Sequence, residues 1–282
     1  MIVSLAVGAP QASTLHAIAR TDAALARITE RLATGLRVNR AADAPADLIA
    51  SEHLAAHLAV LEAESRQIDR ADAVARTADG AIAEVSALLA RAEELAAANA
   101  GSSTLSDAER QANQVELDAV IASIDRVART TAFNGSRLLD GSASLSAAGQ
   151  SIQIPSMLAR DLGLITSDDG SSHALADGAA GGSLSTPEMS HELLRSIRGA
   201  IEQVGRAAGK LGGFQRNTLE PARRAGHAAI ENLAAARSSI RDLDYAWGVA
   251  ELARAGTLRA TALALAARPS DPAPGRSIFL NA

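Results

Sequence analysis

Residues 68–96 read IDRADAVARTADGAIAEVSALLARAEELA, and their apolar positions recur every seven residues. The row begins earlier and comprises Leu54, Leu61, Ile68, Ala75, Ile82, Leu89 and Ala96. A partner row lies three residues beyond four of these positions, at Ala71, Ala78, Val85 and Ala92. A sustained seven-residue repeat keeps one stripe of a helix facing another helix. The pattern therefore predicts a long coiled-coil helix over residues 46–99.

Helical patterns also occupy the flanking segments. Residues 11–36 carry Ile18, Leu25, Ile28 and Leu32 on one face, before Gly35 interrupts the pattern. Ser106 and Glu109 have the spacing of a capping box, which predicts a helix over residues 107–130. A further helical region begins near Glu188, is interrupted at Gly212-Gly213 and then resumes. The run from Arg268 is rich in proline and cannot continue a helix.

The middle of the chain follows a different pattern. Asn134-Gly135 and Asp140-Gly141 predict turns, and residues 151–154 alternate as in a half-buried strand. Residues 166–187 are rich in Gly, Ser, Ala and Asp, which predicts a loop or a poorly ordered insert. The predicted fold is mainly α. Its N- and C-terminal halves form a long antiparallel helical coiled-coil rod with a small β-hairpin or irregular central insert.

The composition excludes several classes of protein. Aromatic residues make up 2% of the 282 positions, so the core must rely on aliphatic side chains and alanine. The net charge of −5 has interspersed signs and lacks the basic footprint of a nucleic-acid binder. The absence of cysteine excludes disulfides and thiolate chemistry. No apolar run approaches the ~20 residues that cross a bilayer, so membrane insertion is not expected.

No constellation of residues favours catalysis, a metal or a cofactor. His53 and His57 lie four apart, but Glu52 precedes the first histidine where a zincin motif needs a glutamate after it. Residues 205–211 have three spacer residues where a phosphate-binding loop needs four. Asn134 begins a glycosylation sequon, although a turn explains it more simply. By its spacing from Ile240, Trp247 is interpreted as a core anchor of the terminal helix pair.

Several motifs resemble those of bacterial flagellins. Residues 31–47, RLATGLRVNRAADAPAD, are similar to the family's R-L-(S/A)-(S/T)-G-L-R-I-N-S-A-A-D-D-P-A-G, with Ala44 in place of an acid and Asp47 in place of glycine. Residues 77–85 resemble T-A-E-G-A-L-x-E-V. The segments IDRV, TAFNG and LLDG follow between residues 124 and 141. Near the other end, residues 217–220 are similar to part of L-G-A-x-Q-N-R-L-E, and residues 239–246, SIRDLDYA, resemble S-R-I-R-D-x-D-Y-A.

The resemblance implies an arrangement in five parts. Residues 1–43 and 240–282 would pair in an inner filament core. Residues 44–140 and 188–239 would form a helical rod around a short outward insert at 141–187. The inner-core residues expected to drive self-assembly are Leu25, Ile28, Leu32, Ile240, Leu243 and Trp247. The rod core is expected to contain Leu54, Leu61, Ile68, Ile82, Leu89, Ile201 and Val204.

The resemblance also implies a function and partners. The chain would polymerise with itself outside the cell, as the structural subunit of a flagellar filament for motility. It would leave through the flagellar type III apparatus without a cleaved signal peptide, and would meet an export chaperone, the cap and hook-associated proteins. Arg91, Leu95 and Glu116 match positions through which a vertebrate innate receptor detects flagellin.

Two other functions fit parts of the pattern. A hook–filament junction protein has the same two-ended helical plan, although residues 239–246 favour flagellin. A soluble coiled-coil interaction protein that forms no polymer would explain the seven-residue repeats alone. The ordered motifs at both ends argue against that second alternative.

Overall fold

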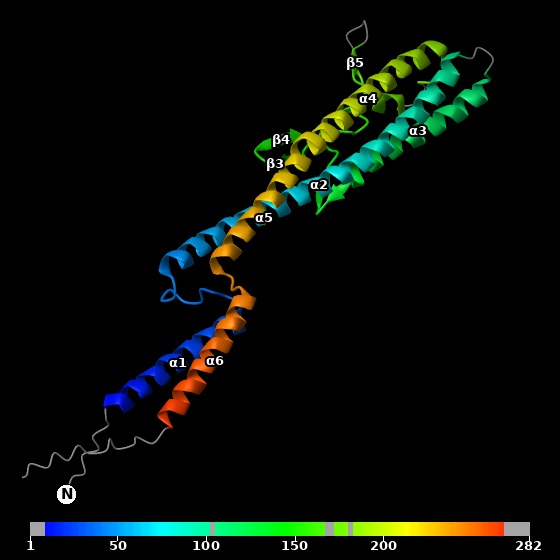
Figure 1. The fold of residues 1–282 in the computed structure, drawn as a ribbon. Helices are drawn as coiled ribbons and strands as arrows, with labels where there is room; N and C mark the ends of the chain where they lie inside the picture. The colour runs from blue at the N-terminus through cyan, green and yellow to red at the C-terminus, as the bar shows by residue number, and fades with distance from the viewer. Residues whose placement is uncertain (1–8, 102–104, 167–171, 180–182, 268–282) are drawn as a thin grey trace, which may run out of the picture. The chain divides into compact units, whose positions relative to one another are not determined.

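The computed structural model describes residues 9–101, 105–166, 172–179 and 183–267, most of which lie in helices (Figure 1). The chain divides into two compact units. Unit 1 comprises Met1–Ala59 and Glu231–Ala282, and unit 2 comprises Val60–Ile230. The proline-rich tail that begins at Arg268 lies outside the described residues. The five-part division made from the sequence stays a prediction.

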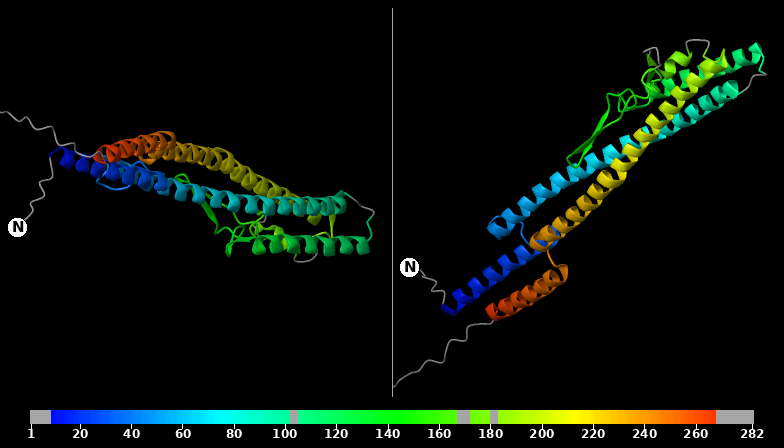
Figure 2. Two further views of the ribbon diagram at one scale, coloured as in Figure 1. Left: turned by 60° about the horizontal axis from the view of Figure 1, so that its bottom comes forward. Right: turned by 90° about the horizontal axis from the view of Figure 1, so that it is seen from above.

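Unit 1 is built on a pair of antiparallel helices, α1 (Ala9–Thr34) and α6 (Tyr245–Ala266), which lie side by side in both views of Figure 2. The start of α2 (Pro45–Gly101) and the end of α5 (Glu220–Arg241) also belong to this unit. The predicted helix over residues 11–36 was correct in type, but it ends at Thr34. It stops there because Gly35 has φ +72°, a left-handed conformation that closes helices.

In unit 2, the remainder of α2 packs against α3 (Asp107–Thr130) and α4 (Pro187–Phe214). Arg91 of α2 pairs with Glu116 of α3, and Asn99 accepts a hydrogen bond from Arg110, so the two helices run antiparallel. α4 pairs with α2 through Arg198. The capping box at the start of α3 is present as predicted, with both of its reciprocal hydrogen bonds.

The predicted coiled-coil row forms the core of unit 2. Its members from Ile68 onward are all buried, as is the partner row: Ile68, Ala71, Ala75, Ala78, Ile82, Val85, Leu89, Ala92 and Ala96. Leu61 is only half-buried, and so is Leu54 in unit 1. On α4, Val204 is fully buried and Ile201 is half-buried. The repeat therefore identified the core, and burial is complete only along part of its length.

The predicted interruption at Gly212-Gly213 was wrong, because α4 runs through both glycines. The helix widens instead into one π-helical turn, Gln215–Leu219, and continues as α5. The backbone N–H of Glu220 bonds to the carbonyl of Gln215, five residues back. Pro221 follows directly and has no N–H to donate. A wider turn accommodates a proline inside a helix, because the ring otherwise clashes with a carbonyl one turn earlier.

Between α3 and α4, the described residues form three short antiparallel strand pairs. They are β1–β2 (Ala132–Phe133 and Ser136–Arg137), β3–β4 (Ser144–Ala147 and Gln150–Gln153) and β5–β6 (Ile165–Thr166 and Ser172–His173). The predicted strand at 151–154 corresponds to β4. Asn134 and Gly135 both have positive φ in the first hairpin, as the turn prediction required.

The prediction of a loop or a poorly ordered insert over residues 166–187 was wrong for the described stretch at Leu175–Ala179, while 167–171 and 180–182 lie outside the described residues. A 3₁₀ helix, η1 (Leu175–Ala179), lies there, and the side chains of Leu175 and Leu184 are fully buried in the core of unit 2. The Leu184 amide donates to Gln114 of α3. A segment rich in Gly and Ser is thus held to the helices by two leucines.

Candidate functional site

The predicted self-assembly residues all belong to unit 1, on α1, at the end of α5, in the connection before α6 and at the start of α6. Ile28 and Leu243 are buried, while Leu25, Leu32 and Ile240 are half-buried. Gly248 allows close packing here, because a Cβ at this position would lie 3.0 Å from a methyl carbon of Leu32 and 3.1 Å from one of Leu243. Five of the six predicted residues therefore lie within unit 1 at partly or fully covered positions.

An ion pair connects the two helices towards their free ends. The guanidinium of Arg259 on α6 lies 2.6 Å from the carboxylate of Asp22 on α1. Both side chains are about half exposed, so the pair contributes little to stability.

At the other end of this helix pair, the connection from α1 to α2 pairs with the connection from α5 to α6. We call this pairing of residues 35–37 with residues 241–243 the backbone clamp. Leu36 and Asp242 form an isolated antiparallel β-bridge. The Arg37 amide donates to the Arg241 carbonyl at 2.7 Å, and the Leu243 amide donates to the Gly35 carbonyl at 2.9 Å. The clamp brings together segments that are about two hundred residues apart in the chain. It places the start of α6 next to the end of α1.

Two arginines reinforce the clamp. The Arg37 guanidinium donates to the Ile240 carbonyl and lies 3.0 Å from Asp47, the residue that stands where the family motif has glycine. Arg241 lies 2.6 Å from Glu52 on the start of α2. The sequence prediction missed both arginines as functional residues. Arg37 and Arg241 lie outside the seven-residue apolar pattern. The sequence marks them only through the two family-like motifs that contain them, at residues 31–47 and 239–246.

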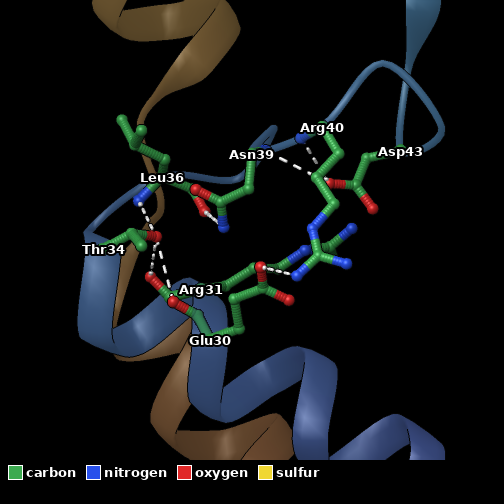
Figure 3. A network of polar contacts seen from close by, with 7 residues as sticks. All are labelled: Glu30, Arg31, Thr34, Leu36, Asn39, Arg40 and Asp43. Atoms are coloured by element: carbon green, nitrogen blue, oxygen red, sulfur yellow. Dashed lines mark hydrogen bonds and ion pairs between the residues drawn. The ribbon is translucent and has the colours of Figure 1, made fainter.

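The turn between α1 and α2 is held by a polar network (Figure 3). Asp43 accepts hydrogen bonds from the backbone amides of Arg40 and Asn39, at 3.0 and 3.1 Å. These bonds lower the pKa of the Asp43 carboxyl from its ordinary value of 3.8, because they favour the charged form. Arg40 also reaches back 2.7 Å to Glu30 of α1. The turn is therefore preorganised by local polar contacts.

Trp247 does not occupy the predicted position, because it is 54% exposed. It is therefore not a core anchor of the helix pair within one chain. On a helix of 3.6 residues per turn, Trp247, Leu258 and Leu265 form one row along α6. Tyr245, Val249 and Leu263 form another, and all six side chains are exposed. The two rows flank the strip that faces α1, where Gly248 and Ala255 are buried.

The residues matched to receptor recognition lie together in unit 2. Arg91 bridges two carboxylates, with nitrogens 3.0 Å from Glu116 and 2.6 Å from Glu94. The hydrogen bonds that Arg91 donates to these two carboxylates raise the pKa of its guanidinium above its ordinary range. Leu95 is only 5% exposed and belongs to the core. Arg91 and Glu116 are therefore accessible at the surface, whereas Leu95 is not. Recognition by a receptor stays a prediction.

The structure also tests the phosphate-binding loop, the metal site and the membrane span that the sequence was searched for. The glycine-containing segment 205–211 lies inside α4 and forms no loop. In the described part of the chain, no three or more His, Asp or Glu side chains are grouped so that they could hold a metal ion. None of the helices described there is both long enough and apolar enough to span a bilayer.

Comparison with known proteins gives matches over most of the chain. Residues 8–144 match the family described as bacterial flagellin N-terminal helical region. The flagellin of Bacillus subtilis (strain 168) is 32% identical over 92% of this chain and 93% of its own length. The flagellar filament 30.7 kDa core protein of Treponema maltophilum is 29% identical, over 86% and 88% respectively. The flagellin of Halalkalibacterium halodurans is 30% identical over 86% of each chain.

Proposed function

Since the chain belongs to the bacterial flagellin family and is thereby a structural subunit of an extracellular flagellar filament, we propose that it polymerises with its own kind through the α1–α6 pair. In this proposal, residues 1–43 and 240–282 form the inner layer of the filament. Residues 44–239 form the rod, with the insert at 141–187 facing outward. The short insert leaves no large outer domain.

One observation carries the proposal: α6 exposes two apolar rows that α1 does not cover, one on each side of the strip that faces α1. Large apolar side chains that are exposed together on one surface are typical of an interaction site. The two uncovered rows of α6 expose six large apolar side chains, two of them aromatic. Burying a fully exposed side chain of this size gains about 1.5–3 kcal/mol, and these side chains, which are about half exposed, still lack roughly half of that gain. Neighbouring copies, which carry the same rows, can supply the missing cover.

The structure of α5 supports the same conclusion. None of its residues is buried, and the apolar row of Leu233, Ala236 and Ile240 is only half covered. Apolar surface left partly uncovered in this way is available for contact with a neighbouring copy. Burial of these rows between subunits would drive assembly without a nucleotide, because removing apolar surface from water is favourable by itself.

We infer the export route and the further partners from membership of the family. The chain would leave the cell through the flagellar type III apparatus without a cleaved signal peptide. A cytoplasmic chaperone would hold its C-terminal region, which contains the uncovered rows of α6. The cap and hook-associated proteins would be its neighbours at the filament ends. Arg91 and Glu116 would supply the exposed part of any receptor contact.

Substituting Leu258→Glu tests the inner-layer assignment. Leu258 is 52% exposed, so a carboxylate there is tolerated in the single chain. In a buried layer of neighbours it would be desolvated, and filaments should not form. The measurement is electron microscopy after addition of a precipitating salt and short flagellar seeds, with circular dichroism to check the helix content of the monomer. Ala83→Glu, at an exposed position of α2, is the matched control.

The possible outcomes separate the candidate functions. Filaments of the natural chain and the control, without filaments of the Leu258→Glu protein, would support the proposal. Filaments from the natural chain, the control and the Leu258→Glu protein alike would contradict a role of α6 in assembly. Persistent monomers of the natural chain would favour the hook–filament junction protein, whose binding to hook or cap proteins would then be measured.

A further inference from the structure

A groove runs along unit 2 between α2 and α5 and is closed at one side by the tip of the β3–β4 hairpin. Its volume is about 790 Å³. Most of its lining side chains are small or apolar, including Leu61, Ile68, Ala222, Gly226 and Ala229. The one charged residue in the lining is Glu64, which is exposed and forms no ion pair among the described residues. The groove therefore combines an apolar floor with the carboxylate of Glu64, the charged group in its described lining.

Helix α3 carries a second apolar row on the side opposite to its core. The core side holds Leu117, Val120, Ile121, Ile124 and Ala128. The opposite row comprises Ala108, Ala112, Val115, Ala119 and Ala122, spaced four and three residues apart, and all five are exposed. Val115 is 65% exposed. The same row ends at Arg126, whose guanidinium bonds to the hydroxyl of Ser123 and forms no ion pair in the described part of the chain.

We propose that the outward row of α3 in one copy packs into the α2–α5 groove of a second copy. The proposal rests on the polymerisation proposed above and adds a contact outside the inner layer. Small residues on both surfaces allow two helices to approach closely, and the alternating spacing of four and three suits coiled-coil packing. Val115 is the one large side chain of the row and would enter the groove.

Charge complementarity identifies the second copy as the occupant. Arg126 on the row of α3 and Glu64 in the groove carry opposite charges, and neither forms an ion pair with any residue that the structure describes. Bringing the row into the groove would pair these two charges as the apolar surfaces close. Each chain carries both the row and the groove, so every copy can offer one surface to each of two neighbours.

The two surfaces are different, so the contact is heterologous. A heterologous contact whose rotation does not close produces an open filament. The contact would therefore set the direction in which copies are added, independently of the layer that contains α1 and α6. Its failure would weaken filament growth without preventing a single chain from folding.

Filling the groove is the first test. A Cβ at Gly226 would meet no atom within 4 Å, so Gly226→Leu places a side chain in the groove without disturbing the fold of the single chain. Gly209→Leu is the matched control, since a Cβ at this exposed glycine of α4 is equally free. Gly226→Leu should raise the lowest protein concentration at which seeded filaments grow by about tenfold, the loss of one modest contact. Gly209→Leu should leave that concentration unchanged.

Charge reversal is the second test. Glu64→Arg or Arg126→Glu alone should impair seeded growth, because the row and groove would then carry like charges. The double variant should recover, and an equimolar mixture of the two single variants should also recover by alternating along the filament. Glu84→Arg, on an exposed part of α2, is the control for a reversal outside the groove.

Failure of this contact is distinguishable from failure of the proposed function. If the natural chain forms filaments and Gly226→Leu forms them at the same concentration, the groove contact is overturned while polymerisation stands. Single reversals without effect, or a double variant no better than the singles, would also overturn it. If the natural chain forms no filaments under any condition, the proposed function itself fails.

Discussion

Units 1 and 2 bury their apolar residues to different extents, although seven-residue spacing occurs in both. In unit 2, α2, α3 and α4 surround one core in which Ile82, Leu89 and Leu117 are at most 1% exposed. In unit 1, α1 packs against α6 and covers only one side of it. A pair of helices has too few neighbours to enclose an apolar core. The same spacing thus indicates an internal core in one unit and an open surface in the other.

Core truncation in unit 2 should give the largest effect on the stability of the single chain. Replacing Ile82 and Leu89 with alanine removes fully buried methyl groups, and each change costs about 2–5 kcal/mol. Trp247→Ala in unit 1 is the contrasting variant. Because its ring is already exposed, its effect on the monomer should stay within about 0.5 kcal/mol. Urea unfolding followed by circular dichroism measures both.

The comparison would break if Trp247→Ala proved as destabilising as the double core variant. That result would mean that the indole ring is covered within one chain. Unchanged unfolding of the Ile82 and Leu89 double variant would show instead that the predicted row does not form the core of unit 2.

Gly35→Ala should give an intermediate effect, on unit 1. Gly35 has φ +72°, and a Cβ there would lie 2.9 Å from the hydroxyl oxygen of Tyr245. An alanine in the left-handed region costs about 1–2 kcal/mol, before any adjustment of the tyrosine. Gly205→Ala is the control, because it lies inside α4 with free space around its Cβ. That substitution should stabilise the chain by about 0.5–1 kcal/mol. Equal effects of the two changes would show that the clamp tolerates a side chain.

Acidification should give the smallest effect, through the turn that follows α1. The folded pKa of Asp43 is lowered, so its carboxylate stabilises the fold at pH values above its ordinary pKa of 3.8. That contribution is lost as the pH falls through the lower, folded value. Asp43→Asn should therefore be less stable than the natural chain at pH 7, and the difference should shrink at pH values below the folded pKa. Urea unfolding at several pH values measures it. A difference that does not depend on pH would exclude the carboxylate as its cause.

Local chemistry explains which features were predictable from sequence. The capping box of Ser106 and Glu109 was found because its two hydrogen bonds need only residues three apart. The row from Ile68 to Ala96 was found because its seven-residue spacing repeats over several turns. The π-helical turn at Gln215–Leu219 was missed. Gly212-Gly213 and Pro221 are residues that usually end a helix, and a sequence pattern does not show that a wider turn between them accommodates the proline.

The parts that were missed depend on contacts distant in the chain. Spacing places Trp247 on a row with Ile240, but it does not say whether that row is covered by the same chain or by another copy. Arg37 and Arg241 act through Ile240 and Glu52, which no local pattern connects with them. Leu175 and Leu184 are single leucines in a segment of small residues, and only the three-dimensional structure shows that they reach the core.

The position of Trp247 has an optical consequence. The chain contains one tryptophan and one tyrosine, and both lie on exposed faces of α6. Because Trp247 is already more than half exposed in the folded monomer, unfolding should change the wavelength of its emission only slightly. Covering it by neighbouring copies would transfer it to apolar surroundings and shift the emission to shorter wavelengths. Intrinsic fluorescence would therefore follow association in real time, without a label, while remaining nearly insensitive to folding.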